Sequence, residues 1–177
     1  MKLGKLDFVP VEDKLNLVAE PASKSIKQNT LSDVLVAEIK PDLADTAAFC
    51  EYYDIGLDVS ANCIVVEARR ADKTWYAACV ILATSRADVN GIIRRQLDAK
   101  KLSFAPMDKA VSITAMEYGG ITPIGLPSDW PILVDSAVAK AAHAVIGSGL
   151  RESKLLVHGN LWNKLPNTTV MDITQPS

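Results

Sequence analysis

Three glycines and two prolines fall within nine residues, Gly119 to Pro127, which read Gly-Gly-Ile-Thr-Pro-Ile-Gly-Leu-Pro. We call this segment the glycine-proline loop (residues 119–127). Glycine lets a ligand approach the backbone closely, and proline restricts the chain so that N–H groups are aimed before a ligand arrives. Such a loop can hold a carbonyl oxygen or an oxyanion. A rigid turn between a helix and a strand has the same composition, so composition alone leaves both interpretations open.

The familiar catalytic signatures are absent from the sequence. It contains no P-loop, no His-Glu-x-x-His, no Cys-x-x-Cys and no Gly-x-Ser-x-Gly. His143 and His158 have no cysteine or carboxylate at ligand spacing, so we expect structural or surface roles for them. Cys50, Cys63 and Cys79 lie far apart in apolar segments and are expected to be buried free thiols. The sequence therefore predicts neither a metal site nor a cofactor.

Length and composition predict one folded domain. The 177 residues are 49% hydrophobic and 23% charged, enough apolar material for a core. The formal net charge of −2 lacks the basic field of a general nucleic-acid binder, so we expect no DNA partner and only local contact with RNA. The longest apolar run, residues 75–83, is too short to cross a bilayer, and residues 1–13 show no signal-peptide core. We therefore expect a cytoplasmic protein with no membrane partner.

Hydrophobic periodicity indicates an α+β order of elements. Residues 1–30 are interpreted as an arm with at most a short helix near 22–27, and residues 31–177 as a single domain. A helix capped by Asp45, one after Ser85 and one that begins at Pro106 and ends near Tyr118 are expected. Apolar runs predict strands at 34–39, 62–68, 74–83, 102–104, 132–134, 142–146 and 154–157. Residues 62–83 read as a hairpin with a central second strand, and no βαβ unit repeats, which favours a barrel-like sheet.

Three motifs in order resemble the YbaK-like domains, which include the editing domain of bacterial prolyl-tRNA synthetases and its free-standing relatives. Residues 118–127 are similar to the family's Gly-x-x-x-Pro loop, with Gly119 and Pro123 in the defining places. Residues 131–135, which end in Asp135, are similar to the strand and aspartate that follow that loop, and residues 147–149 to its late glycine turn. The likeness extends from about residue 34 to residue 156.

The resemblance implies a central mixed or antiparallel barrel-like sheet flanked by helices. It also implies an aminoacyl-tRNA deacylase that hydrolyses the ester of mischarged tRNA in trans, without metal or nucleotide. On this interpretation, backbone N–H groups bind the amino-acid carbonyl, Pro123 holds the loop, and the terminal ribose hydroxyl helps to activate water. A small pocket would then act as a second sieve that admits only substrates below a certain size. The loop residues implied to supply these N–H groups are Gly119, Gly120, Ile121 and Thr122.

Further residues are candidates for substrate contact on the same resemblance. Asp135 either caps the following segment or lines the pocket near a substrate amino group. Arg94 and Lys101 either contact tRNA or belong to a solvated surface. The remaining candidates are the glycines of the loop and of the late turn, Gly125, Gly147 and Gly149.

One position departs from the family pattern. Asn62, followed by Cys63, stands where the family usually has lysine and then threonine. Asparagine can donate and accept hydrogen bonds but cannot neutralise a phosphate. The sequence thus leaves a second function open, a noncatalytic module that binds aminoacyl-tRNA or a small acyl ligand. A third alternative is hydrolysis of an ester or amide outside RNA.

Overall fold

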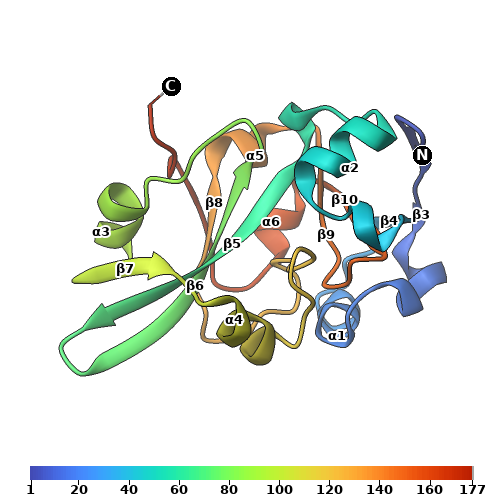
Figure 1. Cartoon of the computed structure of the whole chain (residues 1–177). Helices are drawn as coiled ribbons and strands as arrows, with labels where there is room; N and C mark the ends of the chain where they lie inside the picture. The colour runs from blue at the N-terminus through green and yellow to red at the C-terminus, as the bar shows by residue number, and fades with distance from the viewer. Residues whose placement is uncertain (177) are drawn as a thin grey trace.

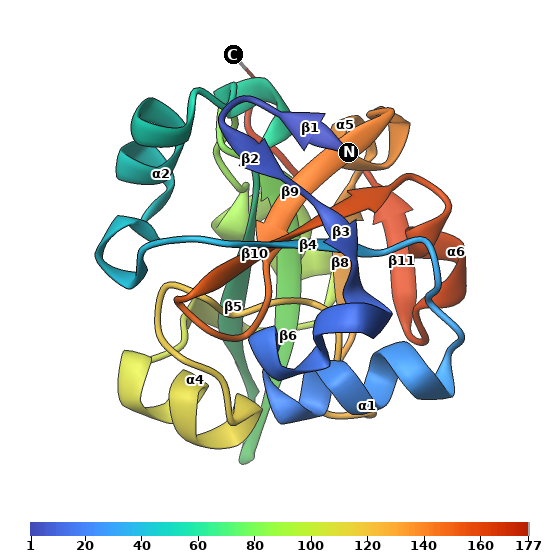
Figure 2. The ribbon, with the colours of Figure 1, turned by 90° about the vertical axis from the view of Figure 1, so that its right-hand side faces the viewer.

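A five-stranded mixed sheet forms one layer of the fold, in the order β11-β8-β6-β5-β7 (Figure 1; β11 is labelled in Figure 2). The computed structural model describes residues 1–176. The strands of this sheet are β5 (Ala61–Arg70), β6 (Lys73–Leu82), β7 (Lys101–Phe104), β8 (Ile132–Asp135) and β11 (Thr168–Met171). β5 and β6 form the expected antiparallel hairpin, and β8 pairs in parallel with β6. The prediction that β6 is central is confirmed, because its apolar side chains are buried on both faces.

A four-stranded antiparallel sheet, in the order β3-β4-β10-β9, faces the first sheet. Its strands are β3 (Val9–Pro10), β4 (Leu35–Glu38), β9 (His143–Gly147) and β10 (Ser153–His158). A parallel bridge between Ser60 and Val145 joins the two sheets at the start of β5. The expected α+β class with a mixed, barrel-like sheet is therefore confirmed.

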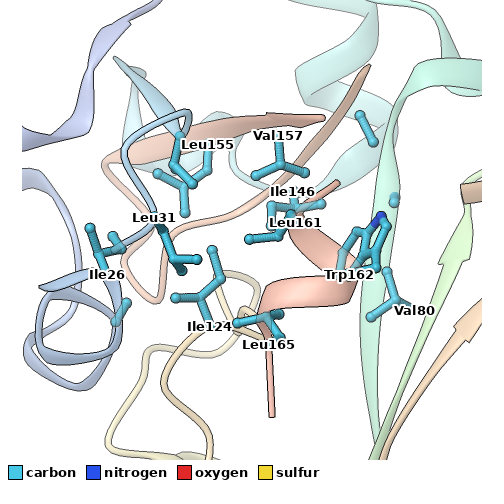
Figure 3. Close-up of a cluster of buried hydrophobic side chains, with 14 of the residues drawn as sticks. Ile26, Leu31, Val80, Ile124, Ile146, Leu155, Val157, Leu161, Trp162 and Leu165 are labelled. Carbon is cyan, nitrogen blue, oxygen red and sulfur yellow. The ribbon is translucent and has the colours of Figure 1, made fainter. Parts of the chain in front are cut away.

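The largest core cluster fills the space between the two sheets (Figure 3). Val80 of β6 and Ile146 of β9 come from opposite layers, and the ring of Trp162 lies beside Val80. Trp162 belongs to the short helix α6 (Leu161–Lys164). Full burial of an aliphatic side chain of this size contributes roughly 2 kcal/mol, so this cluster supplies a large part of the folding free energy.

Residues 1–30, expected as an arm, are packed against the second sheet (Figure 2). They form β1 (Lys2–Leu3), β2 (Leu6–Asp7), β3, the 3₁₀ helix η1 (Val11–Leu17) and helix α1 (Glu20–Gln28). β3 pairs with β4, and the side chains of Phe8, Val11 and Ile26 are buried. The helix expected near 22–27 is present and longer: it begins at Glu20, with Pro21 in its first turn, and Asn29 is its C-cap.

The helices around the sheets begin and end for local reasons. Asp45 occupies the N-cap position of α2 (Thr46–Tyr53), as expected, but its side chain makes no capping hydrogen bond. The π-helical turn η4 (Val89–Ile93), capped by the Asp88 side chain, continues into α3 (Arg94–Gln96). α4 (Met107–Thr114) ends earlier than expected, because Ala115 adopts a left-handed conformation with φ of 56°. The other helices are η2 (Pro41–Leu43), η3 (Leu57–Val59) and α5 (Ser136–Lys140).

Two further expectations, on the cysteines and on membrane-spanning helices, can be compared with the structure. All three cysteines are free, and the expectation of burial holds for Cys50 and Cys79, whereas Cys63 is partly exposed. None of the helices in residues 1–176 combines the length and apolarity that a membrane span requires.

Candidate functional site

A cavity of about 560 Å³ opens where the start of α2, strand β5, the glycine-proline loop and α4 meet. We call it the main cavity. Its inner wall includes Asn62 and Cys63 of β5, and Gly119 and Ile121 of the loop lie across from α4. Gly147 of β9 and Lys154 of β10 line it from the second sheet. The cavity is therefore built at the junction of the two sheets, from segments far apart in the sequence.

The first half of the glycine-proline loop presents alternate residues to the main cavity. Gly119 and Ile121 line it, whereas Gly120 and Thr122 are buried behind them. The Gly120 N–H donates to the carbonyl of Glu117, and the Thr122 N–H contacts the sulfur of Met116 at 3.5 Å. Among residues 1–176, the N–H groups of Gly119 and Ile121 have no acceptor. Of the four candidate donors, these two are the ones left to bind a ligand.

The late glycine turn supports the loop from behind. The Gly149 N–H donates a 2.6 Å hydrogen bond to the carbonyl of Gly120. A Cβ atom at Gly147 would lie 2.5 Å from the carbonyl oxygen of Gly120 and 2.7 Å from that of Ile121. Only a residue without a side chain allows β9 to approach the loop this closely. Gly147 thus lines the cavity and positions the loop, whereas Gly149 is buried and acts through the loop backbone.

The second half of the loop is anchored in the core, away from the main cavity. Thr122 and Pro123 are buried, and the side chain of Ile124 is fully buried in the core cluster of Figure 3. Gly125 has a φ of 93° and packs against the backbone of Pro21 at the start of α1. Pro123 therefore lies where it can hold the loop shape, and Gly125 lies away from the cavity-lining residues.

Asn62 lines the main cavity and is fixed by a neighbour. The hydroxyl of Thr46, in the first turn of α2, donates a 2.6 Å hydrogen bond to Oδ1 of Asn62. Because Oδ1 is engaged, the amide nitrogen is the group of Asn62 left to donate to a ligand. The neighbouring residue Cys63 is partly exposed as a whole, but its thiol is enclosed by protein, and this desolvation raises the pKa of the thiol and makes it a poor nucleophile.

Asp135 caps a helix instead of lining the main cavity. Its Oδ2 accepts from the N–H of Ala137 in the first turn of α5, and its Oδ1 accepts from the N–H of Ile173 at 2.9 Å. Both oxygens of this buried carboxylate are therefore used by backbone donors. Of the two interpretations open at the sequence level, the structure matches the capping one.

Arg94 and Lys101 line a second hollow of about 610 Å³, together with Lys100. We call it the basic hollow. Phe104 lines both hollows, so the two are adjacent. The carboxylate of Glu67 also lies there, but the hydrogen bond from Arg69 holds its pKa below the ordinary value and balances its charge. Among residues 1–176, no carboxylate pairs with Arg94, Lys100 or Lys101.

Several residues of the main cavity were not found from the sequence. Lys154 is the most notable, because its side chain is only 8% exposed and carries a charge into the cavity wall. In the sequence, Lys154 is the one charged residue of the apolar strand predicted at 154–157, and this contrast is the feature that could have marked it. Asp45 and Tyr118 also line the cavity, and Arg151 contacts the carbonyl of Tyr118 at 3.1 Å. His143 and His158 lie outside the lining, and among residues 1–176 no group of metal-ligating side chains is placed to hold an ion.

The sequence model of the aminoacyl-tRNA editing domain matches residues 40–165. The chain belongs to this family. The match contains the residues of the main cavity, four of the five strands of the first sheet (β5, β6, β7 and β8) and two of the four strands of the second (β9 and β10). No curated protein sequence matches the chain.

Solved structures share the fold of this editing domain at low sequence identity. A crystal structure of a candidate trans-editing enzyme for prolyl-tRNA synthetase superposes with a TM-score of 0.75 at 13% identity, covering 90% of this chain and 99% of that one. A hypothetical protein superposes with a TM-score of 0.75 at 18% identity, covering 88% and 100%. A candidate signal transduction protein from Marinobacter aquaeolei VT8 has a TM-score of 0.58 at 13% identity, covering 88% of this chain and 30% of that one. At these identities the likeness concerns the fold.

Proposed function

We propose that the protein is an aminoacyl-tRNA deacylase that acts in trans on mischarged tRNA. The observation that carries the proposal is that Gly119 and Ile121 line a cavity of about 560 Å³ while their N–H groups have no acceptor among residues 1–176. Free backbone donors at a cavity suit a carbonyl oxygen that gains negative charge. An aminoacyl ester is already reactive, so the site needs chiefly to orient it, hold its carbonyl and admit one water.

The reaction is a simple hydrolysis. The water oxygen forms a bond to the carbonyl carbon, and the bond from that carbon to the ribose oxygen breaks. One proton of the water goes to the ribose oxygen and the other to solvent, which leaves a free amino acid and an uncharged tRNA. On this proposal the neighbouring ribose hydroxyl of the substrate helps to activate the water. The chain's own part is to hold the carbonyl with the loop and to limit the size of the acyl group with the cavity walls.

The rim of the main cavity suits the single-stranded 3′ end of tRNA. Phe104 and Tyr118 line the cavity and are 63% and 57% exposed. Exposed aromatic rings provide faces on which unpaired bases stack. The basic hollow continues from Phe104 and offers Arg94, Lys100 and Lys101 for backbone phosphates. The terminal adenosine would thus stack at the rim, with the phosphates of the preceding nucleotides along the basic hollow.

A deacylation panel tests this function. Alanyl, cysteinyl and seryl groups are charged onto noncognate tRNAs, and release of amino acid is followed with and without the purified protein. We expect release from at least one mischarged tRNA well above the uncatalysed rate, and none above it from the correctly charged tRNA. Binding of the tRNAs without hydrolysis would instead favour the noncatalytic module, which the neutral Asn62 keeps open.

A second experiment tests the proposed contact between the basic hollow and the tRNA phosphates. The double variant Arg94→Ala/Lys101→Ala should raise KM about tenfold, leave kcat within about twofold and reduce the dependence of binding on salt. Lys14→Ala/Lys27→Ala is the matched control, because both lysines are exposed on the N-terminal segment and neither lines the main cavity or the basic hollow. Equal effects of the two double variants would contradict this contact.

A further inference from the structure

Lys154 is a buried cation in the wall of the main cavity. Its side chain is 8% exposed, and Nζ donates a 2.9 Å hydrogen bond to the carbonyl of Ala44. The same nitrogen lies 5.1 Å from the centre of the Phe49 ring, a favourable position for a cation. Among residues 1–176, no carboxylate oxygen lies within ion-pairing distance of it. Buried charges in proteins are normally paired, so this ammonium lacks the anion it would be expected to have.

The ammonium has binding capacity to spare. It carries three N–H donors, and the carbonyl of Ala44 accepts one of them. Burial lowers the pKa of Lys154 to about 8, with Cys50 and Asp45 acting in the opposite direction and Arg151 adding to the decrease. The group is therefore still largely protonated at neutral pH. A buried ammonium with unused donors at a cavity wall is suited to an anionic oxygen of a ligand.

The strand register places Lys154 next to the glycine-proline loop. Lys154 lies opposite Gly147 in the β10–β9 ladder, and Gly147 packs against the carbonyls of Gly120 and Ile121. Lys154 and the two loop residues with free N–H groups therefore line one cavity from adjoining segments. The lysine and arginine side chains of the basic hollow do not line this cavity, so Lys154 is the basic residue among its lining.

We propose that the Lys154 ammonium binds the carbonyl oxygen of the aminoacyl ester and stabilises the negative charge that develops there. This assignment rests on the proposed deacylase function and adds a catalytic residue to it. When water adds to the carbonyl carbon, the carbonyl electrons move onto the oxygen held by Lys154 and by the N–H groups of Gly119 and Ile121. When the bond to the ribose oxygen breaks, those electrons return, and Lys154 keeps all its protons throughout.

Kinetics of Lys154→Met test the assignment, with Lys140→Met as the matched control on the exposed face of α5. Lys154→Met should lower kcat by about 100-fold and change KM for mischarged tRNA by less than about threefold. After subtraction of uncatalysed hydrolysis, the wild-type kcat should fall as the pH rises through about 8, and Lys154→Met should lose this decrease. An unchanged kcat, or a rise in KM alone, would overturn the assignment.

Binding of two adenosine analogues gives a readout that does not need turnover. One carries alanine through a neutral amide at the 3′ position, and the other carries an anionic tetrahedral phosphonate in place of the ester. The wild type should bind the phosphonate more tightly, and Lys154→Met should lose at least about tenfold of that preference. Equal weakening of both analogues, or failure of the wild type to bind either, would overturn the role of Lys154.

The two proposals fail in different ways. A wild type that hydrolyses no mischarged tRNA but shows the Lys154-dependent phosphonate preference would end the deacylase proposal and keep the anion site. If wild type and Lys154→Met hydrolyse mischarged tRNA equally fast, the assignment of Lys154 is wrong and the deacylase proposal stands.

Discussion

The Thr46 hydroxyl donates a 2.6 Å hydrogen bond to Oδ1 of Asn62, and this contact joins the first turn of α2 to strand β5 in the wall of the main cavity. It leaves the amide nitrogen of Asn62 as the donor on that wall. The same cavity receives its positive charge from Lys154, on a strand of the other sheet. Each sheet therefore contributes a polar side chain to the wall of the main cavity: neutral Asn62 from β5 and cationic Lys154 from β10.

The Thr46 to Asn62 hydrogen bond should be measurable as a coupling free energy. We expect Thr46→Val and Asn62→Ala each to lower the free energy of unfolding by about 1 kcal/mol. The free energy of unfolding lost by the double variant should be smaller than the sum of the two single losses, by a coupling free energy of about 1 kcal/mol. The reason is that the first substitution already breaks the hydrogen bond that the second would break. Urea unfolding of the four proteins checks this. Additivity within about 0.3 kcal/mol would show that the contact contributes nothing.

Gly147→Ala should inactivate the protein by moving the glycine-proline loop. The new Cβ would lie 2.5 Å from the carbonyl oxygen of Gly120, which is backbone and cannot rotate away. We expect kcat to fall by at least about 100-fold, because a misplaced donor loses most of its effect on the transition state. Gly56→Ala is the control, since its Cβ would come close only to the flexible side chain of Asp58 and would meet Val59 at an ordinary contact distance of 3.9 Å. Normal activity of folded Gly147→Ala would contradict the positioning role of this glycine.

The elements with clear periodicity could be predicted from the sequence, and the contacts between distant segments could not. The hairpin of β5 and β6 has two apolar runs and a charged turn, and the helix after Pro106 has a start signal, so both were expected. The end of α4 was missed because Ala115 has no residue-type preference for its left-handed conformation. The packing of residues 1–30 was missed because Phe8, Val11 and Ile26 show no regular spacing.

The part of the candidate site that could be predicted is the glycine-proline loop, because glycine and proline act on the backbone locally and can be recognised from the sequence alone. Asp135 could not be assigned, because a helix cap and a pocket carboxylate look the same in a sequence. Lys154 was missed because its role depends on the register of β10 against β9, which brings it beside Gly147. Strand register is a long-range property, and no local pattern around residue 154 encodes it.

Asp135→Ala should act on stability and leave the reaction nearly intact. The change removes the acceptors for the N–H groups of Ala137 and Ile173, the second of which is buried. We expect the free energy of unfolding to fall by about 2–3 kcal/mol, and kcat to stay within about threefold of wild type at a temperature where the variant is folded. Thermal unfolding and deacylation kinetics measure the two effects. A 100-fold loss of kcat in the folded variant would assign Asp135 to the site instead.

Lys154→Met should stabilise the fold at neutral pH and less so at high pH. The pKa of Lys154 is lowered in the folded state from 10.5 to about 8, so the unfolded chain binds more protons between these values and wild-type stability rises with pH there. At pH 7 the full cost of the buried charge is present, and we expect Met to raise the free energy of unfolding by about 1–3 kcal/mol. By about pH 10 most of this gain should be gone. A gain that is the same at both pH values would mean that the buried charge is not its source.

The binding of the ester carbonyl by the N–H groups of Gly119 and Ile121 can be tested most directly by comparing wild type and Gly119→Val in the hydrolysis of one mischarged tRNA. Gly119 has a φ of 81°, a left-handed backbone conformation that β-branched valine adopts only with strain, so the substitution should shift the backbone that carries the donor. Circular dichroism and thermal unfolding establish that the variant is folded. We expect hydrolysis by the wild type and a loss of at least about 100-fold in Gly119→Val. Full activity of the folded variant would contradict this role of the two N–H groups.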